Sequence, residues 1–189
     1  MKKIIGIVGS PRNDGNTAAL VQQVLHGAAE AGAATQIVYL NELTYKGCQG
    51  CYRCREIGCC AQMDDLVPVL YDIAAADAVV LGSPNYMGGV TGQLKLMIDR
   101  FCVFMNADYT SRLADGKKLA LVFTQGMPDA GEYAAYYAAV QRSLVFLGFT
   151  GGSESLTAAG LRGQHDAADN AALMEQARAM GMRLLQNEN

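Results

Sequence analysis

One stretch near the start of this chain decides its fold: Ile4-Ile5-Gly6-Ile7-Val8-Gly9-Ser10-Pro11-Arg12-Asn13-Asp14-Gly15-Asn16-Thr17. Its first residues are apolar without interruption, which is typical of a strand covered on both faces of a sheet. A polar, glycine-bearing loop follows, and a helical pattern begins at Asn16. A helix N-terminus presents unpaired N–H groups and the positive end of its dipole. The stretch therefore predicts an α/β fold with a phosphate site near its first residues.

The residues of this loop indicate which phosphate it holds. Ser10, Asn16 and Thr17 supply neutral donors, and Arg12 supplies a fork suited to phosphate oxygens. The loop is not a Walker loop, because five residues rather than four separate its glycines and an asparagine stands where the lysine belongs. It also lacks the G-x-G-x-x-G turn of dinucleotide sites. A phosphate monoester fits it best; the alternative is an ordinary turn with Asn16 or Thr17 as N-cap.

Apolar strand patterns alternate with helical patterns along the whole chain. This alternation predicts an α/β fold with a doubly wound parallel sheet. No repeat or linker interrupts it, so residues 1–189 are predicted to form a single domain. The expected strands are Ile4–Gly9, Thr35–Leu40, Ala78–Gly82, Leu119–Thr124 and Phe149–Leu156. The expected helices are Asn16–Ala31, Leu66–Ala75, Gly92–Asn106, Glu132–Leu147 and Asp166–Gln186.

The bulk composition limits the class of protein. Hydrophobic residues make up 51% of the chain and the net charge is −3, so no basic surface favours nucleic acid or an anionic membrane. No apolar run approaches the roughly 18 residues that a membrane span needs. The apolar run after Lys3 is too short for a signal peptide and no cleavage site follows it. We expect a cytoplasmic protein with neither a nucleic-acid nor a membrane partner.

Ligands of parallel sheets bind beyond the carboxyl ends of the strands, which selects two further loops. After the third strand, Pro84 restrains the backbone, while Gly88 and Gly89 let main chain approach a flat ligand closely. Tyr86 can stack on such a ligand; the alternative is an ordinary turn whose tyrosine packs inward. The loop after the fourth strand adds three candidates for the same ligand, Thr124, Gln125 and Gly126.

Cysteines are concentrated in one short segment, an insertion predicted over residues 46–64. They are Cys48, Cys51, Cys54, Cys59 and Cys60. The C-x2-C-x2-C spacing of the first three resembles the start of a ferredoxin-type [4Fe–4S] run, with Cys59 or Cys60 as the fourth ligand. Zinc is a weaker alternative, because structural zinc usually takes two separated C-x2-C pairs. The thiols can also be free or redox-sensing, and Cys102 is expected to be an inert core thiol.

Taken together, the motifs resemble one family. In order they are Gly9-Ser-Pro-Arg-x-x-Gly-Asn-Thr17, Cys48-x2-Cys51-x2-Cys54, Asp64-Asp65, Gly82-Ser83-Pro84-x-Tyr86-x-Gly88 and Lys95-x3-Asp99-Arg100. This order resembles the NADPH-dependent FMN reductase and iron–sulfur flavoprotein family, whose members are flavodoxin-like. The resemblance covers about residues 3–130, and the rest fits in element order only. It implies a five-stranded parallel sheet in the order 2-1-3-4-5.

The resemblance also implies bound cofactors. The implied contacts of an FMN phosphate are Ser10, Arg12, Asn16 and Thr17. The implied neighbours of the isoalloxazine ring are Pro84, Asn85, Tyr86, Met87 and Gly88. The family spacing favours Cys48, Cys51, Cys54 and Cys60 as ligands of a [4Fe–4S] cluster, with Cys59 as the alternative fourth ligand. Relatives commonly oligomerise, which implies a homodimer or homotetramer whose second subunit completes the pocket.

Two acidic or charged pairs accompany these motifs. Asp64-Asp65 precedes a helical pattern, which indicates an N-cap. Asp99-Arg100 stands near a helix end; the resemblance implies a structural or interface pair, and the alternative is a solvated ion pair.

Three functions are compatible with these residues. The leading hypothesis is an FMN-dependent NAD(P)H oxidoreductase that passes electrons to a quinone, a nitroaromatic, a flavin or a protein. FMN carries the hydride chemistry in such enzymes, so no catalytic acid–base residue is expected, and neither His26 nor His165 has motif partners. The second is an iron–sulfur flavoprotein that carries electrons with FMN and a [4Fe–4S] cluster. The third is a metal- or thiol-based redox sensor without turnover.

Overall fold

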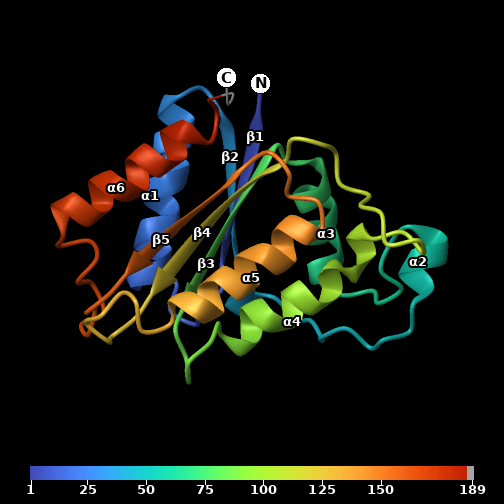
Figure 1. Ribbon diagram of the computed structural model, residues 1–189, viewed down its shortest axis with the longest axis horizontal. Helices are drawn as coiled ribbons and strands as arrows, with labels where there is room; N and C mark the ends of the chain where they lie inside the picture. Colours follow the sequence, from blue (N-terminus) through green and yellow to red (C-terminus); the bar gives the residue numbers. More distant parts are fainter. Residues whose placement is uncertain (187–189) are drawn as a thin grey trace.

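The computed structural model describes residues 1–186, so positions 187–189 of the predicted domain lie outside the described residues. At its centre is a five-stranded, all-parallel sheet in the order β2-β1-β3-β4-β5 (Figure 1). This order confirms the predicted flavodoxin-like, doubly wound fold. The strands are β1 Lys3–Val8, β2 Ala34–Tyr39, β3 Ala78–Pro84, β4 Lys118–Thr124 and β5 Ser153–Ala158.

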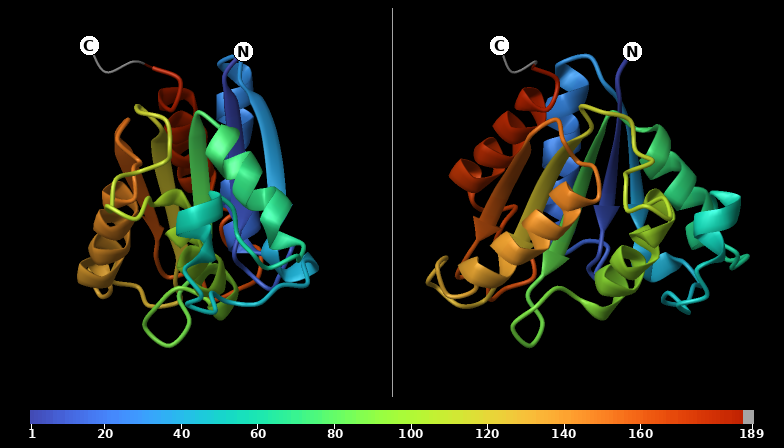
Figure 2. Two further views of the ribbon diagram at one scale, coloured as in Figure 1. Left: turned by 90° about the vertical axis from the view of Figure 1, so that its right-hand side faces the viewer. Right: turned by 45° about the vertical axis from the view of Figure 1, so that its right-hand side comes forward.

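Helices cover both faces of the sheet, because alternate strand residues bury their side chains on opposite sides. The helices of one face are α1 (Asn16–Glu30) and α6 (Ala171–Arg183). Those of the other face are α3 (Leu66–Ala75), α4 (Gly92–Arg100) and α5 (Ala134–Phe146). Figures 1 and 2 show the two layers on either side of the strands. Within β1, Ile4 packs on the first face and Ile5 on the second, which explains why the whole strand is apolar.

The two helices of the first face approach each other through glycines. A Cβ atom at Gly27 would collide with the carbonyl oxygen of Arg178, and one at Gly181 with that of Val24. The absence of side chains at these two positions lets α6 lie directly against α1. That contact also brings the segment before α6 close to the first turn of α1.

Two predicted elements begin later than expected. β5 begins at Ser153 because Gly148 and Gly152 have positive φ angles, +118° and +95°, which end any extended run before it. α6 begins at Ala171, where the Asn170 side chain accepts a backbone hydrogen bond of 3.0 Å from the first turn. Apart from α4, described below, the remaining predicted strands and helices lie close to their predicted positions.

Residues 46–64 lie at one edge of the molecule, beside the end of α4 (Figures 1 and 2). The segment follows β2 and a 3₁₀ turn at Leu40–Glu42, contains the short helix α2 (Arg53–Ile57), and leads into α3. The predicted helix Gly92–Asn106 is shorter than expected: α4 ends at Arg100, and Phe101–Phe104 forms a 3₁₀ turn. In the described part of the chain, no helix combines the length and the apolar character that crossing a membrane requires.

Candidate functional site

A pocket of about 170 Å³ lies at the carboxyl edge of the sheet, where the strand order reverses between β1 and β3. Four loops form it, those that follow β1, β3, β4 and β5. Its lining consists of Ser10, Arg12, Gly15, Asn16, Thr17, Pro84, Asn85, Tyr86, Thr124, Gln125, Gly126 and residues 161–164. The structure thus brings together all of the predicted flavin-site residues except Met87 and Gly88.

The first turn of α1 forms one end of the pocket. Gly15 occupies the N-cap position and has no side chain that can bond the free N–H groups of this turn. The alternative in which Asn16 or Thr17 is the N-cap is therefore wrong, and the free N–H groups can bond an anion. Ser10 is buried, and its Oγ accepts a hydrogen bond of 3.1 Å from the backbone N of Arg12.

The Asn16 side chain joins α1 to the loop after β5. Its Nδ2 donates to the carbonyl oxygen of Gly163 at 2.7 Å, and its Oδ1 accepts from the backbone N of Ala167 at 2.9 Å. Both polar atoms of this side chain are thus bonded within the protein. What Asn16 offers an anion in this arrangement is its backbone N–H.

The loop after β5 contributes pocket residues that the sequence did not predict, 161–164. Asp166 holds this loop by accepting hydrogen bonds from the backbone N of Arg162 at 2.8 Å and of Gly163 at 2.7 Å. Arg162 adds a second guanidinium group to the pocket lining, besides that of Arg12. This loop follows a strand of the sheet, as the rule for parallel sheets requires, but its residues match no ligand-binding motif.

A chain of hydrogen bonds connects the loops after β3 and β4. Nδ2 of Asn85 donates to the hydroxyl of Tyr137 at 3.0 Å, and that hydroxyl donates to Oε1 of Gln125 at 3.1 Å. Burial raises the pKa of Tyr137, so its phenol stays neutral and can serve both partners. Sequence reasoning missed Tyr137, because it lies on α5 and no loop motif includes it. It fixes the orientation of two pocket amides.

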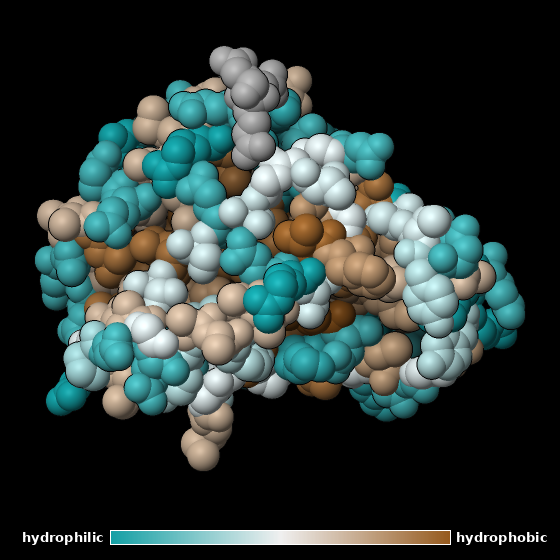
Figure 3. Space-filling view, viewed as in Figure 1, coloured by the Kyte–Doolittle hydropathy of each residue, from teal (hydrophilic) through white to brown (hydrophobic). Residues whose placement is uncertain are grey.

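The tip of the loop after β3 projects beyond the rest of the surface in Figure 3. Tyr86 is 46% exposed and lines the pocket, so the alternative in which its ring packs inward is wrong. Met87 is fully exposed, and φ angles of +52° at Met87 and +83° at Gly88 form the turn. Oδ1 of Asn85 closes that turn by accepting from the backbone N of Gly88 at 3.1 Å.

A second pocket of about 170 Å³ lies in the cysteine-rich insertion. Cys48, Cys51, Cys54 and Cys60 line it, together with Cys102 and Arg100. Burial, followed by the neighbouring thiols of Cys102, Cys60 and Cys48, raises the pKa of Cys54 to about 11. Within residues 1–186, no three His, Cys, Asp or Glu side chains are close enough to form a metal-binding group. The thiols therefore share one pocket without being drawn to metal-ligand distances.

The structure separates the two candidates for the fourth ligand. Cys59 lines a neighbouring, largely apolar pocket of about 160 Å³ together with Tyr71, while Cys60 borders both pockets. Cys102 is not the inert core thiol that the sequence predicted, because the 3₁₀ turn after α4 places it in the lining of the cysteine pocket. No local sequence signal marks that position.

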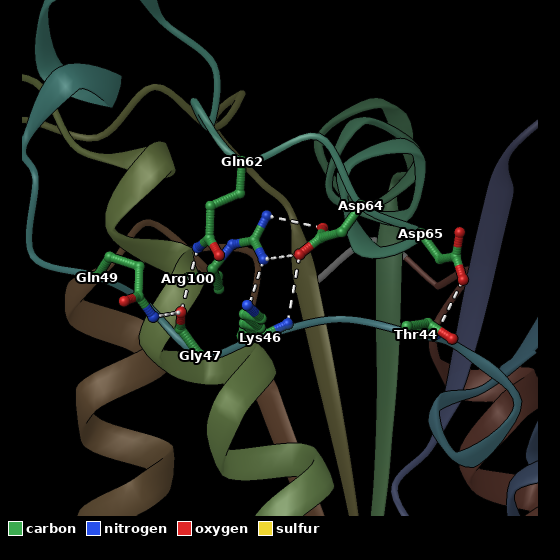
Figure 4. A network of polar contacts seen from close by, with 8 residues as sticks. All are labelled: Thr44, Lys46, Gly47, Gln49, Gln62, Asp64, Asp65 and Arg100. Carbon is green, nitrogen blue, oxygen red and sulfur yellow. Dashed lines mark hydrogen bonds and ion pairs between the residues drawn. The ribbon is translucent and has the colours of Figure 1, made fainter.

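Asp64 and Arg100 form an ion pair that the sequence did not predict (Figure 4). The Arg100 side chain is fully buried and meets both carboxylate oxygens of Asp64, at 2.8 and 3.1 Å. Asp65 instead accepts from the backbone N of Thr44 at 2.8 Å. Asp65 occupies the N-cap position of α3, as predicted, but its side chain makes no capping hydrogen bond. Asp99 bonds Lys95, which leaves Arg100 free to hold the insertion.

A family model matches most of this chain. Residues 2–149 match the family of NADPH-dependent FMN reductases. The chain belongs to this family. The match covers every strand except β5 and every predicted flavin-site residue.

Relatives of this FMN reductase family member include iron–sulfur flavoproteins. One from Methanocaldococcus jannaschii is 45% identical over 98 residues, which are 52% of this chain and 51% of that protein. One from Archaeoglobus fulgidus is 37% identical over 134 residues, 70% of this chain and 64% of that protein. The matched part of the chain thus spans between half and two thirds of the length of these relatives.

Solved structures share the FMN reductase fold over nearly the whole chain. An NAD(P)H:quinone oxidoreductase from Methanothermobacter marburgensis has a TM-score of 0.73 at 16% identity, and covers 100% of this chain and 99% of its own. An FMN-dependent NADH-azoreductase from Bacillus anthracis, solved in complex with FMN, has a TM-score of 0.69 at 12% identity. The alignment covers 98% of this chain and 100% of the azoreductase chain. At these identities the likeness concerns the fold.

Proposed function

We propose that this chain is an FMN-dependent oxidoreductase that takes electrons from NAD(P)H and passes them to a quinone, a nitroaromatic, a flavin or a protein. FMN supplies the hydride chemistry when bound, while the protein supplies binding, orientation and electrostatics. The observation that carries the proposal is the pocket at the β1–β3 switch point. Its two ends suit the two ends of FMN, a charged phosphate and a flat heteroaromatic ring.

The phosphate end combines three kinds of donor. The first turn of α1 presents backbone N–H groups that no side chain caps. Arg12 and Arg162 bring two guanidinium groups, which suit the charge of a phosphate monoester. Ser10 and Thr17 add hydroxyls, and that of Thr17 is held by Thr124 at 2.7 Å. We assign the phosphate to these groups, with Asn16 contributing through its backbone and through its hold on the loop after β5.

The ring end is neutral and partly preorganised. Pro84, Asn85 and Tyr86 form one side of the pocket, and Gln125 and Gly126 form another. Tyr137 fixes the amides of Asn85 and Gln125 through the hydrogen bonds described above. Amide groups held in this way can bond the polar edge of an isoalloxazine ring, while Tyr86 packs on its face.

The test is flavin binding followed by reduction under anaerobic conditions. The purified protein, supplied with FMN, is expected to quench its fluorescence at one flavin per chain and then to lose the flavin absorbance when NADPH or NADH is added. Riboflavin, which lacks the phosphate, is expected to bind more weakly. A protein that binds neither flavin would contradict the proposal.

A homodimer or homotetramer would complete the pocket. Tyr86, Met87 and Met127 are exposed apolar residues on the loops that border it, and Met87 lies at the tip of a projecting turn. We expect Met87→Asp to shift the assembly toward monomers in size-exclusion chromatography with light scattering, while Met63→Asp, at an exposed methionine of the cysteine-rich insertion, leaves it unchanged.

A second candidate function adds a [4Fe–4S] cluster to the flavin, which supplies one-electron transfer. Cys48, Cys51, Cys54 and Cys60 fit such a group, because their thiols line one pocket whereas Cys59 lines another. Burial and the neighbouring thiols raise the pKa of Cys54, so binding of a metal there would release its proton. The protein would then act as an electron carrier between two-electron and one-electron partners.

Metal analysis and two serine variants test the cluster. Anaerobically purified protein is expected to contain iron and acid-labile sulfide, whereas zinc without sulfide would favour a structural zinc site. Cys60→Ser is expected to lose iron and sulfide but keep FMN binding, and the matched variant Cys59→Ser is expected to keep both. Equal loss in the two variants would contradict the choice of Cys60. Thiol oxidation without any NAD(P)H oxidation would favour the sensor hypothesis.

A further inference from the structure

Arg100 places a guanidinium group in the interior beside the cysteine pocket. Its side chain extends from the end of α4 toward the insertion and is 0% exposed. Nη1 donates to the carbonyl oxygen of Lys46 at 2.9 Å and to Oδ2 of Asp64 at 2.8 Å, and Nη2 donates to Oδ1 of Asp64 at 3.1 Å (Figure 4). This two-pronged pair fixes the plane and position of the guanidinium group.

One nitrogen of this group has no acceptor. Nε of Arg100 is buried and bonds no atom of residues 1–186. A buried donor of a charged group is costly to leave unpaired, and native proteins rarely do so unless something supplies the acceptor. Because Arg100 is part of the lining of the cysteine pocket, a ligand in that pocket can provide the acceptor.

Arg100 and Cys60 both belong to the lining of the cysteine pocket. Burial lowers the pKa of Arg100, but the hydrogen bond to Asp64 outweighs burial and raises it, so the guanidinium stays charged. A neutral thiol is a weak acceptor, whereas thiolate or sulfide sulfur is a charged one. The guanidinium group is therefore placed to meet negatively charged sulfur on the Cys60 side of the pocket.

A second arginine repeats this arrangement nearby. Nε of Arg55 is also buried and lacks a hydrogen-bond partner among the described residues. Its guanidinium lies against the rings of Tyr52 and Tyr109, 4.7 and 5.0 Å from their centroids. A hydrogen bond to Tyr109 raises the pKa of Arg55, and Cys102 raises it further. Arg55 thus provides a second unused donor near Cys102, one of the thiols that line the pocket.

We propose that Arg100 is a positioning residue for an iron–sulfur cluster: its guanidinium donates to sulfur on the Cys60 side and raises the reduction potential of the cluster, and Asp64 offsets part of that charge. This inference rests on the cluster proposed for the cysteine pocket. A cationic donor stabilises the reduced state more than the oxidised state, because reduction adds negative charge beside it. Hydrogen bonds to cluster sulfur and nearby charge both set cluster potentials.

Arg112 offers a matched control. It fastens the same insertion by donating to the carbonyl oxygens of Cys54 at 2.5 Å and Arg55 at 2.7 Å, and its Nε donates to Asn106 at 2.6 Å. Its Nε, unlike that of Arg100, has an acceptor within the protein, and Arg112 borders the neighbouring pocket of Cys59. Replacing Arg112 therefore reports what loosening the insertion does by itself.

The test is an anaerobic redox titration of the holoprotein, followed by the EPR signal of the reduced cluster. Arg100→Gln is expected to shift the reduction equilibrium about tenfold toward the oxidised cluster. For a one-electron step, this corresponds to a reduction potential about 59 mV lower than that of the wild type. Asp64→Asn keeps the cation and removes its counter-charge, so the potential is expected to rise. Arg112→Gln is expected to change the equilibrium by less than about twofold.

Opposite shifts of the reduction potential in the Arg100 and Asp64 variants support the inference. If the ion pair were purely structural, removing either partner would shift the potential in the same direction. Shifts of the same sign, or no shift in either variant, overturn it. If Arg100→Gln loses the cluster, Asp64→Asn decides alone, and a potential that does not rise overturns the inference. Wild-type protein without iron and sulfide would overturn the cluster proposal itself. That outcome differs from a bound cluster whose reduction potential does not change when Arg100 is replaced.

Discussion

Asn16 donates a hydrogen bond of 2.7 Å to the carbonyl oxygen of Gly163, a residue 147 positions further along the chain. The same side chain accepts from the backbone N of Ala167. Through these two bonds the first turn of α1 holds the loop that brings Arg162 to the pocket. The position of the second guanidinium group therefore depends on an asparagine in the first loop.

Asn16→Ala is expected to loosen the loop after β5. The substitution leaves the Gly163 carbonyl and the Ala167 amide without their partner, and we expect a loss of about 1–3 kcal/mol in the free energy of unfolding. Urea unfolding measures this loss, and faster exchange of the Ala167 amide locates it. Asn13→Ala is the control, because Asn13 bonds only the exposed Glu42 side chain. Equal effects of the two variants would refute the role given to Asn16.

Arg12→Ala and Arg162→Ala are each expected to weaken FMN binding. Loss of charge-assisted hydrogen bonds to a phosphate costs about 1.5–3 kcal/mol, or roughly a 10- to 150-fold increase in Kd. Fluorescence titration with FMN measures the change. Riboflavin is the matched ligand: its affinity should be the same in both variants and in the wild type. An equal loss of riboflavin affinity would place these arginines away from the phosphate.

Gly181→Ala is expected to destabilise the contact between α1 and α6. The added methyl group would collide with the Val24 carbonyl, so the two helix backbones must move apart. Overpacking of this kind costs about 1–3 kcal/mol. Gly92→Ala, at the start of α4, is the control, since a Cβ there meets no described atom within 4 Å. Thermal and urea unfolding should show a loss in the first variant and none in the second.

Tyr45 is expected to make the fold sensitive to alkaline pH. Burial raises the pKa of Tyr45 to about 12, and its hydroxyl donates to the Gln93 carbonyl at 2.7 Å. Between about pH 10 and 12 the unfolded chain has lost this proton while the folded chain keeps it, so stability falls as pH rises. The contribution is fully present below about pH 10.

Tyr45→Phe removes this titration. Its free energy of unfolding, measured in urea at a series of pH values, is expected to fall less steeply above about pH 10 than that of the wild type, with a constant difference at lower pH. Parallel curves for the two proteins over the whole range would show that Tyr45 does not titrate in this way.

Local patterns were sufficient for most of the fold and for part of the site. The β1 strand, the loop from Ser10 to Thr17 and the start of α1 follow from apolar runs and helix-start signals within a few residues of one another. The carboxyl-end rule then selected the loops after β3 and β4. The loop after β5 was not selected, because its residues 161–164 match no ligand-binding motif and reach the pocket only through the tertiary contacts of Asn16 and Asp166.

The sequence by itself predicted three of the four loops that line the pocket and the five clustered cysteines, because strand alternation and motif spacing are properties of neighbouring residues. The family spacing already favoured Cys60 over Cys59, and only the tertiary structure decided that Cys102 joins the pocket of the other thiols while Cys59 lines a neighbouring one. It also decided that the Asp64 carboxylate bonds Arg100, 36 residues away. Such partners depend on which distant segments the fold brings together. The residues adjacent to each partner in the sequence do not specify this.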